Sequence, residues 1–437
     1  MKKVLVITYY WPPAGGSGVQ RWVKFVKYLR SYGWEPVVYT PSNPEFPEID
    51  ESLLKDIPAN LEIIKQPIWE PYNIYKTLTG KKKTHKIGAG FATEKGKMGL
   101  ADKISTWIRG NLLIPDPRLF WIKPSVKFLL HYLKEHKVDV IVSSGPPHSM
   151  HLIARGVRRK LDIPWVADFR DPWTQIDFYK DLMLSGWANK KHHCMERTVL
   201  EECDQVLVVG NTMKEEFQQM GINPEKIKVI TNGFDDDDLP KTGVEPDTVL
   251  SLVHIGTLNK SRNPDALWAA LKELTQENPE FAKDFKLRLI GKTDGAVLER
   301  ITHFNLDPFT EKISYIPHEK VSEEQLKSQV LLLILNNTQN AKGIVTGKFF
   351  EYLAAKRPIL TLGDKEGDVA KILNDTKAGK VVDFYDRDTI KTEMLKFYDA
   401  FKNGTLANAP ENIDKYSRKN LTGQLTKNFD ALIRNFV

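Results

Sequence analysis

Short apolar runs alternate with longer amphipathic stretches along most of the chain. In the first half, the apolar runs predict strands at 4–8, 36–40, 61–65, 138–143, 165–168, 206–209 and 227–231. Helical periodicity between them predicts helices that include 19–30, 148–160, 190–202 and 212–220. Strands of this length separated by helices are typical of βαβ units. The first half therefore predicts a doubly wound, mostly parallel sheet.

A second series of the same kind follows the polar segment 235–243, which has no periodicity and is typical of a linker. Strands are predicted at 250–255, 286–290, 312–316, 331–335, 358–362 and 380–382, and helices at 264–276, 319–328, 346–355, 369–374 and 389–402. We therefore expect an α/β protein with two Rossmann-like domains, at 1–238 and 249–411. Open α/β sheets bind ligands at the carboxyl ends of their strands, so an interdomain cleft is the expected site.

The composition excludes several classes of protein. With 41% hydrophobic and 27% charged residues, the 437-residue chain is globular rather than disordered. Two cysteines, Cys194 and Cys203, cannot form a disulfide framework and favour a reducing compartment. The apolar run at 4–7 is too short for a signal peptide, and no run reaches the roughly 18–20 residues of a bilayer span. We expect a cytoplasmic protein.

The formal net charge of +7 is unevenly distributed. Residues 1–200 hold 31 basic and 19 acidic side chains, whereas residues 201–437 hold 32 and 37. Most of the excess lies in 76–137, with 14 basic and 4 acidic residues, and the insert 72–122 within this region does not fit the strand and helix alternation. The insert is either a solvated loop or an arm that lies on anionic lipid, at the inner face of a membrane, or on a charged acceptor. Nucleic acid is not expected, because the interleaved aromatic residues of a single-strand groove are missing.

Two glycine-containing segments follow predicted strands. The first contains Gly15 and Gly16, whose amides can approach an anion at the start of the next helix. A dinucleotide fingerprint needs a third glycine where Arg21 stands, so NAD is not expected. The second segment runs from Gly256 to Arg262 and again ends in a cation before a helix.

The segment 341–355 carries the most chemical information. It lacks the spacing of a phosphate-binding P-loop, and a phenylalanine follows Lys348 where that loop needs Ser or Thr. What remains is a helix whose first turn offers free amides beside Lys348, with Glu351 one turn later. Such a turn suits a diphosphate, and the displaced carboxylate suits a ribose diol. The alternative is an ordinary capped helix with its aromatic residues in the core.

Together these segments resemble the retaining glycosyltransferases of family 4, which have the two-domain GT-B fold. The resemblance covers nearly the whole chain. It rests on the Gly15–Gly16 loop, the segments 168–173 and 229–235, the spacing from Gly256 to Arg262, and the segment 348–354.

The resemblance implies transfer of a sugar from a nucleoside diphosphate donor to a glycan or lipid-linked acceptor, with retention of configuration and without a cofactor or metal. It also implies donor contacts and a final segment, 412–437, that crosses back to the first domain. The implied donor-side residues are Gly15, Gly16, Asn232, Gly256, Thr257, Arg262, Lys348 and Glu351. Many family members carry a further glutamate eight positions before Glu351, where this chain has Gly343.

On the acceptor side, polar residues follow two predicted strands of the first half. His148 follows the strand 138–143, and Asp168, Arg170 and Asp171 end or follow the strand 165–168. Each is expected to face the cleft, where Arg262, Lys348, Asp171 and His148 are the candidate catalytic residues. A sugar-nucleotide epimerase on the same two-domain scaffold is the alternative function.

Overall fold

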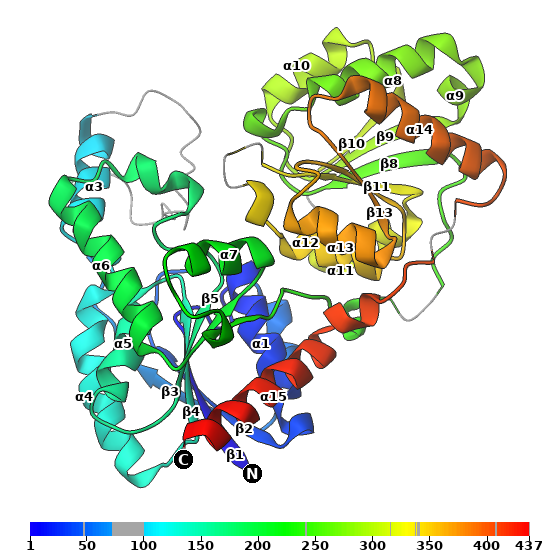
Figure 1. The fold of residues 1–437 in the computed structure, drawn as a ribbon. Helices are drawn as coiled ribbons and strands as arrows, with labels where there is room; N and C mark the ends of the chain where they lie inside the picture. The colour runs from blue at the N-terminus through cyan, green and yellow to red at the C-terminus, as the bar shows by residue number, and fades with distance from the viewer. Residues whose placement is uncertain are drawn as a thin grey trace. The chain divides into compact units, whose positions relative to one another are not determined.

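The computed structural model describes residues 1–46, 49–71, 100–240, 243–314, 316–336, 338, 341–406 and 409–436. The chain forms two compact units: unit 1 comprises Met1–Thr231 and Arg418–Val437, and unit 2 comprises Asn232–Ser417. Each unit holds its own parallel sheet with helices on both faces (Figure 1). The predicted α/β class with two Rossmann-like domains is confirmed.

Unit 1 is built on a seven-stranded sheet in the order β3-β2-β1-β4-β5-β6-β7, with every pair parallel. Helices α4 and α5 cover one face, and α1 and α15 cover the other (Figure 1). The strands are β1 Lys2–Ile7, β2 Trp34–Pro41, β3 Glu62–Gln66, β4 Val140–Gly145, β5 Trp165–Phe169, β6 Gln205–Val208 and β7 Ile227–Val229. The helices are α1 Ser17–Leu29, α3 Leu100–Asn111, α4 Leu119–Glu135, α5 Ser149–Arg158, α6 Gly186–Glu202, α7 Asn211–Gln219 and α15 Arg418–Phe436.

Unit 2 has a six-stranded parallel sheet in the order β10-β9-β8-β11-β12-β13. One face packs on α8 and α14 and the other on α12 and α13. The strands are β8 Leu250–Ile255, β9 Phe285–Ile290, β10 Thr310–Ile313, β11 Val330–Ile334, β12 Ile359–Leu362 and β13 Gly379–Val382. The helices are α8 Asp265–Glu277, α9 Pro279–Asp284, α10 Gly295–His303, α11 His318–Lys327, α12 Gly347–Ala354, α13 Asp368–Thr376 and α14 Arg387–Lys402.

The strand orders reverse at one place in each sheet, between β1 and β4 in unit 1 and between β8 and β11 in unit 2. Loops leave such a reversal point in opposite directions, and the crevice between them is where open α/β sheets bind ligands. The segments that follow these strands are those that sequence reasoning selected: the Gly15–Gly16 loop, the loop before His148, and Gly256.

Some element boundaries differ from those predicted. Residues 232–238, which the sequence analysis gave to the first domain, belong to unit 2. The predicted insert, 72–122, overlaps the start of α4, which begins at Leu119. Residues 72–99 of the insert lie outside the described part of the chain. The final helix begins at Arg418 rather than near residue 412, because a short 3-10 turn, Ile413–Tyr416, precedes it.

Helix α15 is tied to the beginning of unit 1 by both packing and hydrogen bonding. Phe429 packs edge-on against Trp34, with ring centroids 5.2 Å apart, and the Tyr32 hydroxyl donates to the carbonyl of Lys419 at 3.0 Å. Leu421 and Leu425 complete the buried cluster on that face of the sheet. The last helix is therefore part of the core of unit 1.

A buried ion pair joins the middle of unit 1. Arg21 and Asp168 are fully enclosed, with Arg21 Nη2 2.8 Å from Asp168 Oδ1. The other oxygen of Asp168 accepts from Trp22 Nε1 at 2.7 Å and from the Ser144 hydroxyl at 3.0 Å. Burial alone would raise the pKa of Asp168, but the Arg21 charge and the hydrogen bonds from Arg21 and Trp22 outweigh it and lower the pKa. Arg21 Nη1 also donates to the carbonyl of Thr231 at 3.0 Å, so the pair links α1, β4, β5 and the last residue before unit 2.

Within the described ranges, none of the helices is both long enough and apolar enough to cross a bilayer.

Replacing Asp168 with alanine is expected to destabilise the protein by about 3–5 kcal/mol, because it leaves the Arg21 charge buried without its partner. Denaturant unfolding followed by tryptophan fluorescence would measure this, since nine of the ten tryptophans belong to unit 1. Asp162→Ala is the control, since Asp162 is 86% exposed in its pair with Arg158 and its loss should cost about 0.5 kcal/mol or less. Equal costs for the two variants would contradict the prediction.

Candidate functional site

In unit 2, a group of charged side chains gathers where β8 ends. Lys348, from the first turn of α12, reaches back to Gly256, and a Cβ at Gly256 would overlap Lys348 Nζ. Gly256 also has a positive φ of 119°, which L side chains rarely adopt. Glycine is therefore required here by its backbone conformation, and its missing side chain leaves room for the lysine ammonium group. We call Gly256, Arg262, Lys348 and Glu351 the Lys348 cluster.

The members of this cluster influence one another electrostatically. Burial, and then the nearby Arg262 charge, lower the pKa of Lys348 to about 8, while Glu351 acts in the opposite direction. Arg262 is held by its Nε, which donates to Asn336 Oδ1 in the segment after β11. Glu351 accepts from Gln325 Nε2 of α11 at 3.3 Å. Both sides of the β8/β11 reversal point thus contribute to the cluster.

Helix α12 is oriented by its own core residues. The Tyr352 hydroxyl accepts from the backbone N–H of Ile255 at 3.1 Å, which fixes the helix to the end of β8. At the other end, Thr346 is the N-cap but makes no side-chain cap hydrogen bond, and the first turn holds no acidic residue. The positive end of the helix dipole is therefore left for an anion.

The remaining donor-side residues lie in different surroundings. Thr257 follows Gly256 and is exposed. Asn232 is the first residue of unit 2, at the point where the chain leaves unit 1. Gly343 ends a short 3-10 turn, and its neighbour Lys342 forms an ion pair with Glu366 at 2.7 Å. Glu366 is therefore paired with the residue next to Gly343, the position at which the resemblance leads us to expect a glutamate.

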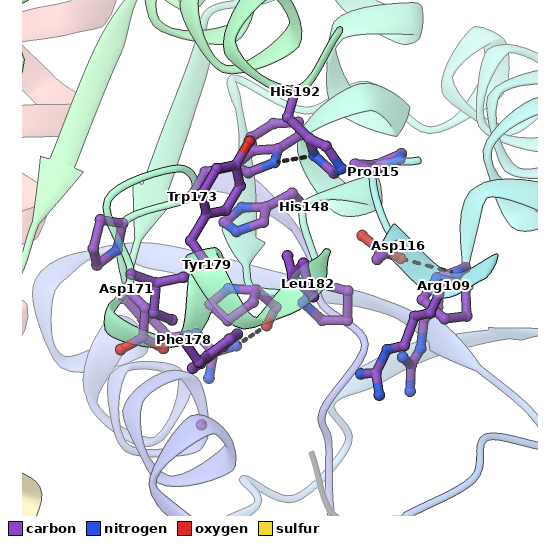
Figure 2. A pocket seen from close by; sticks show the side chains of 18 of the residues that line it. Arg109, Pro115, Asp116, His148, Asp171, Trp173, Phe178, Tyr179, Leu182 and His192 are labelled. Atoms are coloured by element: carbon purple, nitrogen blue, oxygen red, sulfur yellow. Dashed lines mark hydrogen bonds between the residues drawn. The ribbon is translucent and has the colours of Figure 1, made fainter. Parts of the chain in front are cut away.

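In unit 1, a cavity of about 490 Å³ opens at the β1/β4 reversal point (Figure 2). We call it the unit 1 pocket. Its lining includes five residues predicted from the sequence: Gly15, Gly16, His148, Arg170 and Asp171. Asp168 is not among the lining residues, since it lies in the core beneath them as the partner of Arg21.

One wall of the pocket is a stack of rings that holds His148. The His148 ring stacks on Trp173 with centroids 4.4 Å apart and planes 3° from parallel. Trp173 Nε1 donates to His192 Nδ1 at 3.1 Å, so His192 carries its proton on Nε2, which faces the Gly110 carbonyl at 3.3 Å (Figure 2). Burial, and then the charges of neighbouring histidines and Arg170, lower the pKa of His148. His148 is therefore a neutral imidazole near pH 7.

The loop that carries Asp171 and Trp173 is anchored from below by Glu196. Glu196 Oε1 accepts from the backbone N–H groups of Trp173 and Thr174, both at 3.2 Å, and Oε2 accepts from the Thr174 hydroxyl. The carboxyl is fully buried, and burial raises its pKa against the effect of these hydrogen bonds. Glu196 is thus a positioning residue for the pocket wall.

Arg170 spans the floor of the pocket between two of its loops. Its backbone N–H donates to the Gly145 carbonyl at 3.0 Å, and its Nη2 donates to the Pro146 carbonyl. A Cβ at Gly18 would overlap Arg170 Nη1, so the guanidinium lies against the start of α1. Its buried Nε has no hydrogen-bond partner among the described residues. A cation at a helix start without an acidic first turn suits an anionic or hydroxyl-rich ligand.

Several residues of the pocket were missed from the sequence. His192 of α6 is one of them: its ring is buried and lines the pocket. Asp116, between two prolines, accepts from the Ser149 N–H at 2.8 Å and so caps the helix that follows His148. Among the described residues of the Lys348 cluster and the unit 1 pocket, no three His, Cys, Asp or Glu side chains lie close enough together to bind a metal ion.

Comparison with protein-family models finds a match over part of the chain. Residues 91–238 match the family model described as Glycosyltransferase Family 4. The resemblance to this family is confirmed. A comparison with curated protein sequences finds no match.

Solved structures show the same GT-B fold over the whole chain. A glycosyltransferase from Rickettsia africae is 14% identical, covers 99% of each chain and has a TM-score of 0.63. Anabaena HepE in complex with UDP is 13% identical, covers 99% of this chain and 100% of its own, and has a TM-score of 0.62. A Listeria monocytogenes protein named for UDP-N-acetylglucosamine 2-epimerase activity is 12% identical, with coverage of 100% and 98% and a TM-score of 0.58.

Glu196→Leu is expected to destabilise the protein by about 3 kcal/mol, because buried donors of Trp173 and Thr174 lose their acceptor. Glu196→Gln keeps one acceptor oxygen for the two N–H groups and should cost clearly less. Thermal unfolding of both variants provides the measurement, with Glu201→Leu as the control, since Glu201 lies half-exposed on the same helix. If Gln and Leu at position 196 proved equally costly, the anchoring role would be wrong.

Proposed function

We propose that the protein is a retaining glycosyltransferase that moves a sugar from a nucleoside diphosphate donor to a glycan or lipid-linked acceptor. The observation that carries this proposal is the Lys348 cluster: two cations and an uncapped helix start meet at the reversal point of the unit 2 sheet. The UDP complex of Anabaena HepE, which has the same fold, supports a nucleotide donor.

The cluster suits the chemistry of this transfer. When the bond between the sugar and the diphosphate breaks, negative charge develops on the leaving oxygen. Lys348, Arg262 and the N–H groups of α12 stabilise that charge because they are already in place before the reaction. Glu351, one turn further along the same helix, accepts hydrogen bonds from the ribose hydroxyls. These residues need no bound metal for their roles.

The unit 1 pocket is the proposed acceptor site. It offers a neutral His148 imidazole, the Asp171 carboxylate and the Arg170 guanidinium, together with aromatic and proline side chains. Sugars are commonly held by this combination of polar groups and ring faces. We assign no general base, because a leaving phosphate can itself take the acceptor proton in a retaining transfer.

Lys348→Ala and Glu351→Ala test the proposal directly. Removing one preorganised group that stabilises developing charge costs about 100-fold or more in rate, so Lys348→Ala is expected to lower turnover of the nucleotide sugar to that extent. Lys396→Ala is the matched control, because Lys396 is a 65% exposed lysine of α14 in the same unit. Unchanged turnover in both cluster variants, with the protein folded, would falsify the assignment.

The alternative function is that of a sugar-nucleotide epimerase. The Listeria monocytogenes structure that is named for this activity supports the alternative, because it has the same fold. Incubation with the donor alone separates the two functions. An epimerase converts the free donor without an acceptor, whereas a glycosyltransferase releases the nucleoside diphosphate in step with glycosylation of the acceptor. The anomeric configuration of that product, read by NMR, tests retention.

The affinity for a nucleoside diphosphate should fall as the pH rises above about 8, where Lys348 in the free protein loses its proton and its charge. Binding must then take up a proton, which weakens it progressively. Titration calorimetry with UDP between pH 7 and 9.5 measures the effect. Lys348→Arg, which stays charged over this range, should flatten the profile, and an equally flat wild-type profile would contradict the prediction.

A further inference from the structure

Exposed large apolar side chains are concentrated at one edge of unit 1. Four of them belong to α3 and the residue after it, two lie just before and at the start of α6, and the exposed fractions of the six lie between 37% and 63%. We call them the apolar ridge: Ile104, Trp107, Ile108, Leu112, Met183 and Trp187. The first four follow the i, i+3, i+4 and i+8 spacing of a single helix face. An apolar helix face that is left exposed usually serves an interaction.

Hydrogen bonds bring the two parts of the ridge together. Asn111 Nδ2 donates to the Met183 carbonyl at 3.2 Å, and Asn111 Oδ1 accepts from the Ser185 N–H at 2.7 Å. A Cβ at Gly110 would lie 2.6 Å from the Leu182 carbonyl oxygen, so the backbones are in close contact there. Figure 1 shows α3 beside the start of α6, as these contacts require.

The composition of the ridge and of its flanks suits a lipid surface. Tryptophans such as Trp107 and Trp187 are favoured at the boundary between headgroups and acyl chains. Lys103 and Lys190 are exposed beside the ridge, and Lys191 Nζ lies 4.7 Å from the centre of the Trp187 ring. By sequence, the region 76–137 that includes α3 has 14 basic and 4 acidic residues, which complements anionic headgroups.

The segments that carry the ridge also contribute to the lining of the unit 1 pocket. Arg109 and Gly110 of α3 line the pocket, as do Phe178, Tyr179 and Leu182 of the 3-10 segment Asp177–Leu182 (Figure 2). The ridge and part of the pocket lining therefore belong to the same segments of unit 1. Through His192, the Gly110 carbonyl is connected to Trp173 and so to the ring stack on His148.

We propose that the apolar ridge docks on an anionic bilayer and presents the unit 1 pocket to acceptors carried in that bilayer. The docking stands independently of the chemistry in the pocket. The statement about acceptors rests on the proposed glycosyltransferase function and narrows its acceptor to a lipid-linked one.

Vesicle flotation tests the docking without any nucleotide sugar. The full chain is mixed with vesicles of phosphatidylglycerol and phosphatidylcholine, or of phosphatidylcholine alone, at low salt. We expect binding to the anionic vesicles, and we expect the double variant Trp107→Glu/Trp187→Glu to reduce the bound fraction by about tenfold. Tyr385→Glu in unit 2, at a side chain that is 73% exposed, is the matched control and should bind as the wild type does.

Three outcomes would overturn the proposal: no binding of the wild type, equal binding to neutral vesicles, or wild-type binding by the double variant. A second copy of the chain is the competing occupant of the ridge. If the wild type were a dimer without vesicles and the double variant a monomer, the ridge would be a dimer interface instead. Circular dichroism of each variant establishes that it is folded. Loss of vesicle binding with normal transfer to a soluble acceptor would separate the docking from the catalytic function.

Discussion

The buried pair of Arg21 and Asp168 is the interaction on which the arrangement of unit 1 depends. Desolvating two charges is costly, and the cost is offset here because Asp168 also accepts hydrogen bonds from Trp22 and Ser144 while Arg21 donates to the Thr231 carbonyl. The pair therefore ties the first helix to the ends of two neighbouring strands. The loops that leave those strands carry His148, Arg170 and Asp171 into one pocket, and the loop before that helix carries Gly16 there.

The fold could be predicted because both halves follow one local rule. Buried parallel strands need near-continuous apolar runs, and the crossover helices need amphipathic ones, so each element is visible in its own window of sequence. Helix α4 was harder to see, because Pro124 lies inside it and the preceding residues belong to the basic insert. The insert itself could be predicted only as a region of unusual charge.

The two candidate sites differ in how much of them local sequence reveals. The Lys348 cluster depends on glycine conformation and helix starts, which leave a signature in sequence at Gly256 and Lys348. The unit 1 pocket depends on side chains far apart in the chain: Glu196 holds the loop of Trp173, and His192 bridges that loop to Gly110. Nothing within α6 alone marks these two as buried. The ridge is the converse case, since its helical spacing predicts a core face, and only the fold shows that it is exposed.

The placement of α15 has a consequence for how the protein is made. Unit 1 is discontinuous: its first 231 residues are synthesised before unit 2, but the helix that covers one face of its sheet comes after unit 2. Until that helix leaves the ribosome, the apolar surface around Trp22 and Trp34 lacks its cover. Nascent chains with such exposed surface are the ones that chaperones hold. Unit 2 can therefore complete its fold during translation, whereas unit 1 must wait for the final turns of the chain.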